Sequence, residues 1–382
     1  MKCTILNRNY PPNGGITGHS ANELAGYLQA HGVDVKVVTV GVPYGAAGGL
    51  SDEVFGSVTS LKTLYKGRQK HLRLLASVMD GLRMAGRAFQ VDHGPVICLT
   101  DPALLPCWVS RKASKKNRSW FYWSMDLFPE AFMASGLAAE TNTVYRWLYR
   151  NTRASAPTTL IALGPKQADF IGSSFAPIQQ KVILPCGISD GSSRGGDAPE
   201  WYRDHSEKVF LGYVGNLGEA HDPDFVIEVM KSIDPLVQRF ILVGYGAKAD
   251  RVCAVGKKLP GVTVLERVER EHLRFIDIHL ATLLPEWDHV CVPSKAVSAV
   301  CEGGCLLLCC SDQNDNWELL QDASWRVSPH WPGKNHISDL VRSFTSKTVS
   351  SKKKRAALVK NDLLHMKDQA FANILEAIQS AC

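Results

Sequence analysis

A serine and a lysine stand where a buried strand passes into a helix in the last third of the chain. An apolar strand is expected over Leu280–Leu284, and Val292-Pro293-Ser294-Lys295 follows it at the start of a helix-compatible segment that ends at Gly303-Gly304. The first turn of a helix offers free backbone N–H groups and a partial positive charge, and a lysine adds a full charge. The segment therefore predicts an anion site, unless it is an ordinary α/β crossover that carries an incidental lysine.

A carboxylate follows an aromatic strand in the first half of the chain. Trp120–Ser124 predicts a buried strand, and Asp126 comes directly after it. Residues at this point of a parallel sheet face the ligand-binding edge, where a carboxylate can orient or deprotonate a hydroxyl group. The alternative is that Asp126 caps a helix that begins near Pro129-Glu130.

The elements that must position these residues begin with a βαβ unit. An apolar strand is expected at Cys3–Leu6, and Gly14-Gly15 follows it. Ser20-Ala-Asn-Glu23 is a capping box that predicts the start of a helix, and the valine-rich stretch 33–40 predicts a second strand. Such a unit indicates a parallel sheet.

The same pattern restarts in the second half of the chain. Residues 189–197 are rich in Gly and Ser and are the best linker candidate. A strand over Val209–Val214 then leads into the turn Gly215-Asn216-Leu217-Gly218, and Asp222-Pro223 begins a helix. The sequence thus predicts an α/β protein with two doubly wound, Rossmann-like domains that face each other across a cleft.

We expect four segments along the chain. Residues 1–188 form the first domain, residues 189–207 a linker and residues 208–366 the second domain. Residues 367–382 read as an amphipathic helix that could pack back on the first domain.

Composition fits a cytoplasmic globular protein. The chain has 382 residues, which suits two domains, and 45% of them are hydrophobic. Its beginning has no signal-peptide pattern, and its longest weakly polar run is too short to span a bilayer. The 11 cysteines lie mostly in apolar strands, so we expect neither disulfides nor a metal site.

Positive charge is concentrated in residues 61–90, which carry as much net charge as the whole chain's +6. Leu72, Leu75, Met79 and Leu82 recur there at helical spacing. The segment is either a solvated helix face or a surface for an anionic membrane or a phosphorylated lipid. Nucleic acid is not expected as a partner, because no recognition motif accompanies the charge. The membrane hypothesis rests on Lys66, Arg68, Lys70 and Arg73.

Several motifs, in this order and spacing, resemble family 4 retaining glycosyltransferases of the GT-B fold, in particular bacterial polysaccharide-type enzymes. The resemblance covers most of the chain. It is carried by Pro11-Pro12-x-Gly14-Gly15, Asp126-Leu127-Phe128-Pro129-Glu130, Tyr213-Val214-Gly215-Asn216-Leu217-Gly218, Ala220-His221-Asp222, Val243-Gly244-Tyr245-Gly246 and Pro293-Ser294-Lys295.

The resemblance implies a nucleotide-sugar donor, linked to UDP or GDP, on the second domain. Its diphosphate would meet the glycine turn and the lysine at the helix start, and a backbone contact with the base is expected at Arg267-Val268. The implied donor site comprises Gly215, Asn216, Gly218, His221, Arg267, Val268, Pro293, Ser294, Lys295 and Ser298. Lys295 would stabilise the departing diphosphate, so no cofactor and no metal are expected to be required.

The resemblance also implies an acceptor side on the first domain. Gly14 and Gly15 would let a glycan or a lipid-linked acceptor approach, and Asp126 would act on the acceptor hydroxyl. The expected products are surface polysaccharides or glycolipids. The enzyme would be cytoplasmic and could lie at the inner face of the cytoplasmic membrane.

This sequence departs from the family pattern at four positions. Asn216 and His221 stand where relatives carry an arginine and a lysine, and Val290 and Ser298 stand where they carry two glutamates. Two further hypotheses therefore accompany the transferase: a nucleotide-sugar 2-epimerase, and a GT-B protein that binds a nucleotide sugar without chemistry. Glu286, Glu302 and His289 are nearby in sequence, but spacing alone assigns none of them to the missing role.

Overall fold

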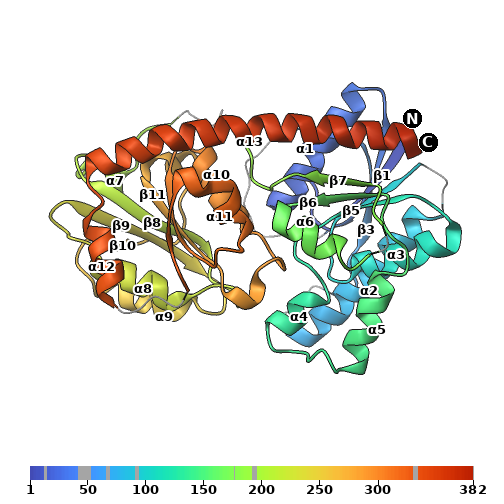
Figure 1. Cartoon of the computed structure of the whole chain (residues 1–382), viewed down its shortest axis with the longest axis horizontal. Helices are drawn as coiled ribbons and strands as arrows, with labels where there is room; N and C mark the ends of the chain where they lie inside the picture. Colours follow the sequence, from blue (N-terminus) through green and yellow to red (C-terminus); the bar gives the residue numbers. More distant parts are fainter. Residues whose placement is uncertain are drawn as a thin grey trace. The chain divides into compact units, whose positions relative to one another are not determined.

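The computed structural model describes residues 1–12, 15–41, 53–65, 69–90, 94–175, 177–191, 196–329 and 334–381. The chain divides into two compact units (Figure 1). Unit 1 comprises Met1–Cys186 and Met366–Cys382, and unit 2 comprises Gly187–His365. The sequence placed the corresponding boundaries after residues 188 and 366, with a linker over 189–207. In the structure this stretch belongs to unit 2 and includes the short helix α7 (Glu200–Arg203), while residues 192–195 lie outside the described part.

Unit 1 is built on a parallel sheet of seven strands in the order β3-β2-β1-β4-β5-β6-β7. Central strands such as β1 are buried along most of their length, as expected for strands that carry helices on both faces. The strands are β1 (Lys2–Leu6), β2 (Asp34–Gly41), β3 (Ser57–Lys62), β4 (Val96–Cys98), β5 (Trp120–Trp123), β6 (Thr159–Ala162) and β7 (Gln180–Ile183). The helices are α1 (Ile16–Ala30), α2 (Lys70–Ala88), α3 (Leu105–Lys116), α4 (Glu130–Ala134), α5 (Thr143–Thr152) and α6 (Pro165–Gly172).

The first helix begins earlier than the capping box predicted. Gly15 is the N-cap of α1, so Ser20 lies inside the helix. A tight contact explains the early start, because a Cβ atom at Gly18 would lie only 2.6 Å from the carbonyl oxygen of Asn9. The first turn of α1 therefore packs directly on the backbone that follows β1, which only a glycine permits.

Unit 2 is built on a parallel sheet of six strands in the order β10-β9-β8-β11-β12-β13. The strands are β8 (Val209–Asn216), β9 (Gln238–Tyr245), β10 (Val262–Val264), β11 (Ile278–Thr282), β12 (Cys305–Cys309) and β13 (Ser324–Val327). The α-helices are α7, α8 (Pro223–Ser232), α9 (Ala249–Gly256), α10 (Ser294–Cys301), α11 (Asp315–Leu320) and α12 (Lys334–Arg342), and the 3-10 turns are η1 (Arg270–Phe275), η2 (Pro285–Trp287) and η3 (Gln321–Ala323). The long helix α13 (Ser346–Ala381) begins in unit 2, and its residues from Met366 belong to unit 1.

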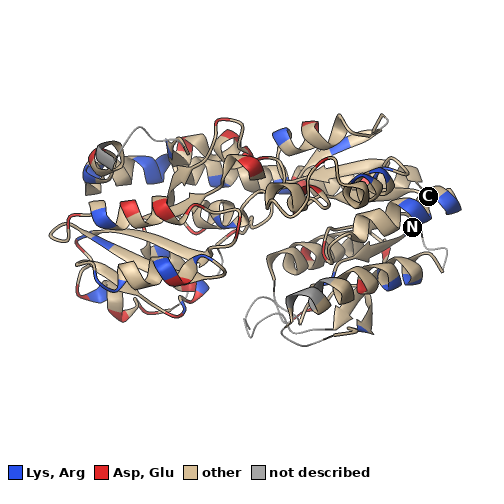
Figure 2. Cartoon of the chain, turned by 90° about the horizontal axis from the view of Figure 1, so that it is seen from below, with Lys and Arg blue, Asp and Glu red and all other residues tan. Residues whose placement is uncertain are grey.

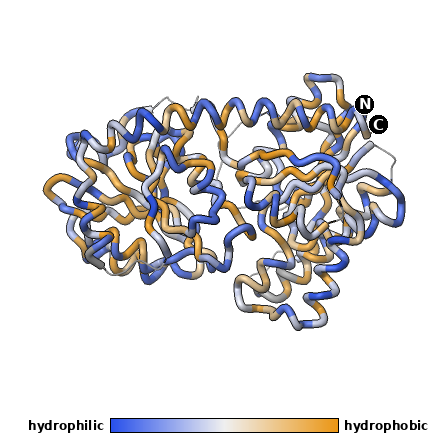
Figure 3. Tube along the Cα trace, viewed as in Figure 1, coloured by the Kyte–Doolittle hydropathy of each residue, from blue (hydrophilic) through white to orange (hydrophobic). Residues whose placement is uncertain are grey.

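Apolar side chains fill both faces of the unit 2 sheet, and the apolar stretches of the trace follow its strands (Figure 3). One cluster joins Leu211 and Tyr213 of β8 to α8, α9 and α12, and another joins β12 to α10, α11 and α13. Both sheets are parallel and carry helices on their faces, so the predicted α/β class with two doubly wound halves is confirmed.

Candidate functional site

The carboxyl edge of the unit 2 sheet brings together turns that are far apart in the sequence. β8 lies between β9 and β11 and runs parallel to both, so the carboxyl ends of the three strands meet at one edge. The strand order reverses between β8 and β11, which is where open α/β sheets bind ligands. Lys295 in the first turn of α10 reaches this place, since a Cβ atom at Gly215 would lie 3.7 Å from Lys295 Cδ. The glycine turn and Lys295, the two main parts of the predicted anion site, are therefore neighbours.

Two glycines shape the carboxyl ends of β8 and β9. Gly215 has φ +143° and Gly246 has φ +104°, values that L side chains rarely adopt. A Cβ atom at Gly246 would lie 2.1 Å from Asn216 Oδ1, so the Asn216 side chain lies over the turn that follows β9. The Leu217 N–H donates to the Tyr245 carbonyl at 2.7 Å, which joins the two turns. The turn around Gly218 is thus held by backbone contacts, with Asn216 packed against it.

The Lys295 ammonium rests on a buried tyrosine. Its Nζ donates a hydrogen bond to the Tyr213 hydroxyl and lies 4.0 Å from the centre of the Tyr213 ring. Burial lowers the pKa of Lys295 to about 7, and the Cys291 thiol acts in the opposite direction with a smaller effect than burial. An anion bound beside Nζ would stabilise the charged form. Lys295 is therefore a cation whose charge depends on having an anionic partner.

His221 lies beside this lysine as a neutral imidazole. Its Nδ1 is 2.6 Å from the Thr282 carbonyl oxygen, which assigns the proton to Nδ1 and leaves Nε2 as an acceptor. Burial lowers the pKa of His221 to about 3, and the positive charges of Lys295 and Lys248 act in the same direction. His221 can accept a hydrogen bond from a hydroxyl group, but as a neutral imidazole it supplies no positive charge.

Ser298 lies one turn further along α10 and has a backbone partner. Its Oγ donates to the carbonyl oxygen of Gly187 at 3.2 Å, and a Cβ atom at Gly187 would lie 2.5 Å from that Oγ. Ser294 contributes its carbonyl oxygen to the same contact, 2.8 Å from the Gly187 Cβ position. Pro293 precedes the helix, and its carbonyl oxygen accepts from Asn316 Nδ2 at 3.0 Å. The small side chain of Ser298 thus serves the packing of α10 against the start of unit 2.

Arg267 and Val268 lie beyond the carboxyl end of β10, an edge strand. Arg267 is exposed and pairs with Glu269 at 2.9 Å. Val268 packs on a buried cluster that includes Phe210 and Ile276. The assignment of this pair to the nucleotide base stays a prediction.

Spacing in the sequence assigned no role to Glu286 or Glu302, and the structure places them in different surroundings. Glu302 is at the far end of α10 from Lys295, and its Oε1 pairs with Arg270 at 3.2 Å and accepts from Ser189 at 3.3 Å. Glu286 is exposed in η2, just after the carboxyl end of β11. Glu286 therefore lies at the carboxyl edge of the sheet, and Glu302 has a structural role.

Sequence reasoning missed three residues of this site: Tyr213, Thr282 and Lys248. Tyr213 and Thr282 are buried strand residues, which the sequence presents as core positions. Lys248 Nζ donates to the carbonyl oxygens of Glu219 and His221, at 2.7 and 3.0 Å. Lys248 therefore ties down the loop that carries His221. No pattern in the sequence singled out any of the three.

A second group of polar residues gathers at the carboxyl edge of the unit 1 sheet. Asn9 Nδ2 donates to Asp101 Oδ2 at 2.8 Å, and Arg8 Nε lies 3.4 Å from Asp101 Oδ1. Asp126 follows β5 and is exposed, yet the surrounding protein and the Asp101 charge raise its pKa to about 6. The capping alternative for Asp126 finds no support, because α4 begins behind Pro129 without a side-chain cap. A carboxylate with a pKa of about 6 can take up a proton near neutral pH, as a general base must.

Of the two glycines predicted on the acceptor side, the structure describes Gly15. Gly14 lies outside the described residues, and Gly15 is exposed with φ +134° at the start of α1. A Cβ atom at Gly15 would lie 3.5 Å from the Asn9 side chain. Gly15 therefore belongs to the same edge as Asn9 and Asp101.

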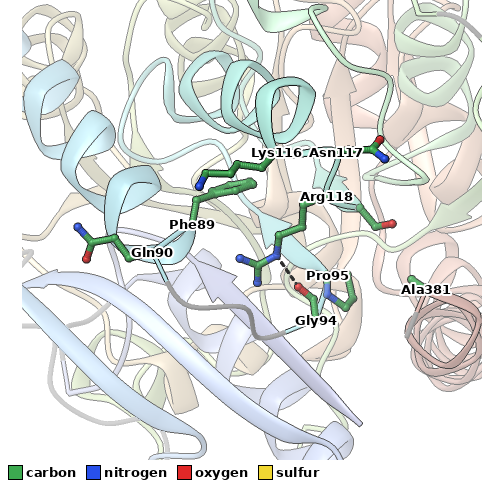
Figure 4. Close-up of a pocket in the computed structure, with 9 residues that line it drawn as sticks. Phe89, Gln90, Gly94, Pro95, Lys116, Asn117, Arg118 and Ala381 are labelled. Carbon is green, nitrogen blue, oxygen red and sulfur yellow. Dashed lines mark hydrogen bonds between the residues drawn. The ribbon is translucent and has the colours of Figure 1, made fainter.

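A pocket of about 450 Å³ lies on the opposite, amino-terminal side of this sheet (Figure 4). Arg118 donates to the carbonyl oxygens of Gly94 and Ala88, at 2.7 and 2.8 Å, and its guanidinium lies 5.2 Å from the Phe89 ring centre. These bonds join the end of α2 to the start of β4. The pocket is therefore bordered by a structural arginine and stands apart from the carboxyl edge.

The described residues show neither a metal cluster nor a membrane-spanning helix. No group of three or more His, Cys, Asp or Glu side chains could hold a metal ion among them. None of their helices has both the length and the apolar character required to cross a membrane.

Comparison with solved structures places the chain in the GT-B fold. WaaG, a glycosyltransferase involved in lipopolysaccharide biosynthesis, matches with a TM-score of 0.66 at 15% identity, over 97% of this chain and 98% of WaaG. Anabaena HepE in complex with UDP-glucose matches with a TM-score of 0.67 at 14% identity, over 99% of this chain and 100% of HepE. The N-terminal domain of Candida albicans trehalose-6-phosphate phosphatase gives 0.69 at 11% identity, over 100% and 97% of the two chains. No protein-family model and no curated protein sequence matches this chain. The predicted GT-B architecture is confirmed.

The anion site can be tested with inorganic pyrophosphate. We expect Lys295→Ala to lower pyrophosphate affinity by roughly tenfold to a hundredfold below pH 7, because a charge-assisted contact is lost. Above pH 7 the free lysine loses its proton, since its pKa is about 7, so the advantage of the wild type should shrink as the pH rises. Titration calorimetry across this pH range measures both effects, and ionisation of pyrophosphate cancels between the two proteins. The exposed Lys257→Ala variant is the control, and equal affinities for wild type and Lys295→Ala would remove Lys295 from the site.

Proposed function

We propose that the chain is a glycosyltransferase that moves a sugar from a UDP- or GDP-linked donor to a glycan or a lipid-linked acceptor, with retention at the anomeric carbon. Its pathway would be the biosynthesis of surface polysaccharides or glycolipids. The observation that carries the proposal is Lys295 at the glycine turn, on the edge where the unit 2 sheet reverses its strand order. The fold supports it, because HepE shares this architecture and binds UDP-glucose.

On the donor side, the diphosphate would lie against the turn from Gly215 to Gly218, with Lys295 beside it. As the bond from the anomeric carbon to the diphosphate breaks, negative charge grows on the leaving oxygen, and the lysine stabilises it. The neutral His221 would accept a hydrogen bond from a sugar hydroxyl through Nε2. Glu286 is the exposed carboxylate available for a further sugar hydroxyl. These groups supply the charge that the reaction needs, so the proposal includes no metal.

On the acceptor side, Asp126 would orient the acceptor hydroxyl and receive its proton as the new bond to the anomeric carbon forms. A pKa of about 6 leaves the carboxylate mainly ionised at neutral pH while keeping it close to the range that suits proton transfer. Asn9 and Arg8 hold Asp101 in place beside it.

A second candidate is a GT-B protein that binds a nucleotide sugar without chemistry. Two observations favour it: His221 is neutral, and Ser298 bonds to Gly187 where a glutamate would contact the donor. A nucleotide-sugar 2-epimerase finds no separate support in the described residues.

We also propose that unit 1 contacts an anionic membrane surface at the cytoplasmic face. Leu72, Leu75, Met79 and Leu82 form a stripe along α2, and each is between 36% and 59% exposed. Apolar side chains on a basic helix suit an interfacial position, and Lys and Arg recur along the ribbon of unit 1 (Figure 2). Lys66 and Arg68 lie outside the described residues, and Lys70 and Arg73 lie in α2 without a described side chain.

A donor screen tests the transferase. The protein is incubated with several UDP- and GDP-sugars, and thermal stabilisation, hydrolysis and transfer are measured. We expect one donor to stabilise the protein and to be turned over, and Lys295→Ala should lower that turnover by roughly a hundredfold. Stabilisation without hydrolysis or transfer would favour the non-catalytic protein, and an unchanged rate in Lys295→Ala would contradict the assigned role.

Liposome sedimentation tests the membrane contact. One variant carries Gln at Lys66, Arg68, Lys70 and Arg73. The control variant has the same change of charge in unit 2, with Gln at the exposed residues Lys257, Lys258, Lys347 and Lys354. We expect binding to anionic vesicles to fall in the first variant only, and to weaken with salt in the wild type. Equal loss in both variants would indicate non-specific attraction, and no loss in the first would leave α2 as a solvated face.

A further inference from the structure

Tyr213 holds two parts of the candidate donor site with one hydroxyl group. The residue is fully buried in β8, and its hydroxyl donates to the Asn216 carbonyl oxygen at 2.7 Å. Burial raises the pKa of Tyr213, so the phenol keeps its proton and can serve as this donor. The same oxygen accepts the hydrogen bond from Lys295 Nζ. The glycine turn and the lysine are therefore connected through a single atom.

The contact fixes a side chain that would otherwise be mobile. A lysine has four rotatable side-chain bonds, and ordering them costs rotamer entropy. Tyr213 restricts Lys295 at two points, through the hydroxyl and through the ring face 4.0 Å from Nζ. The absence of a side chain at Gly215 leaves room for the lysine chain, whose Cδ would contact a Cβ atom there.

Neighbouring groups do not duplicate this role. His221 is turned toward Thr282 by its Nδ1 hydrogen bond, and Lys248 is bound to the carbonyl oxygens of Glu219 and His221. Cys291 raises the pKa of Lys295, against the larger effect of burial. The hydroxyl of Tyr213 is thus the polar group to which the ammonium is bonded in the described site.

We propose that Tyr213 is a positioning residue that sets the place of the Lys295 ammonium over the glycine turn, so that the lysine meets the diphosphate of the donor without rearrangement. The inference rests on the proposed function, because it names a further residue of the same donor site. Tyr213 acts through Lys295 and the Asn216 carbonyl, and it does not itself touch the reacting atoms.

The test is a double-mutant cycle on pyrophosphate affinity and on turnover of the donor. The variants are Tyr213→Phe, Lys295→Ala and the double variant, with Tyr202→Phe as the matched control. Tyr202 packs against Phe210 and Phe275, in a cluster that excludes Lys295. We expect Tyr213→Phe to lower pyrophosphate affinity about tenfold, the effect of losing one hydrogen bond to a charged group. In the Lys295→Ala background the same change should have a much smaller effect, because only the hydrogen bond to the Asn216 carbonyl is then lost.

The outcomes separate the inference from the proposed function. Equal affinities for Tyr213→Phe and wild type, or an equal loss in both backgrounds, would overturn the positioning role. Failure of the wild type to bind pyrophosphate would overturn it as well. The two substitutions could have coupled effects on pyrophosphate affinity while no nucleotide sugar is turned over. That result would support the positioning role and contradict the transferase. Thermal unfolding of Tyr213→Phe, compared with Tyr202→Phe, distinguishes a local effect from a general loss of stability.

Discussion

One partly buried lysine and its need for an anionic partner account for most of the candidate site. Burial makes the charged form of Lys295 costly, and a phosphate group would stabilise that form. The surroundings fit this constraint: Tyr213 binds the ammonium, Gly215 leaves room for its chain, and His221 stays neutral. A second cation at position 221 would face unfavourable repulsion from Lys295. The neutral side chains at positions 216 and 221 thus belong to one local arrangement built around a single lysine.

The two units use the edge of a parallel sheet in different ways. In unit 2, a cation and glycine turns suit a diphosphate. In unit 1, Asp101 and Asp126 place negative charge at the corresponding edge, and their repulsion contributes to the raised pKa of Asp126. Under the proposed function, unit 2 would stabilise the leaving group and unit 1 would take up the acceptor proton.

Much of the fold could be predicted from the sequence, because buried parallel strands are nearly continuous apolar runs. The closeness of Gly215 and Lys295 was also predictable, since strand ends and helix starts meet at one sheet edge. The start of α1 was predicted wrongly, because the contact of Gly18 with Asn9 outweighs the capping signal at Ser20. Tyr213 could not be recognised, because its hydroxyl is hidden among core residues. Ser298 could not be placed either, because its partner Gly187 is 111 residues away in the chain.

The most direct test of this account is the number of protons taken up when pyrophosphate binds at pH 8. It is obtained by titration calorimetry in two buffers with different ionisation enthalpies. Lys295 is mostly neutral at this pH in the free protein, and a bound anion should restore its charge. The account predicts that the wild type takes up about one proton more than Lys295→Ala. Equal proton uptake by the two proteins would contradict it.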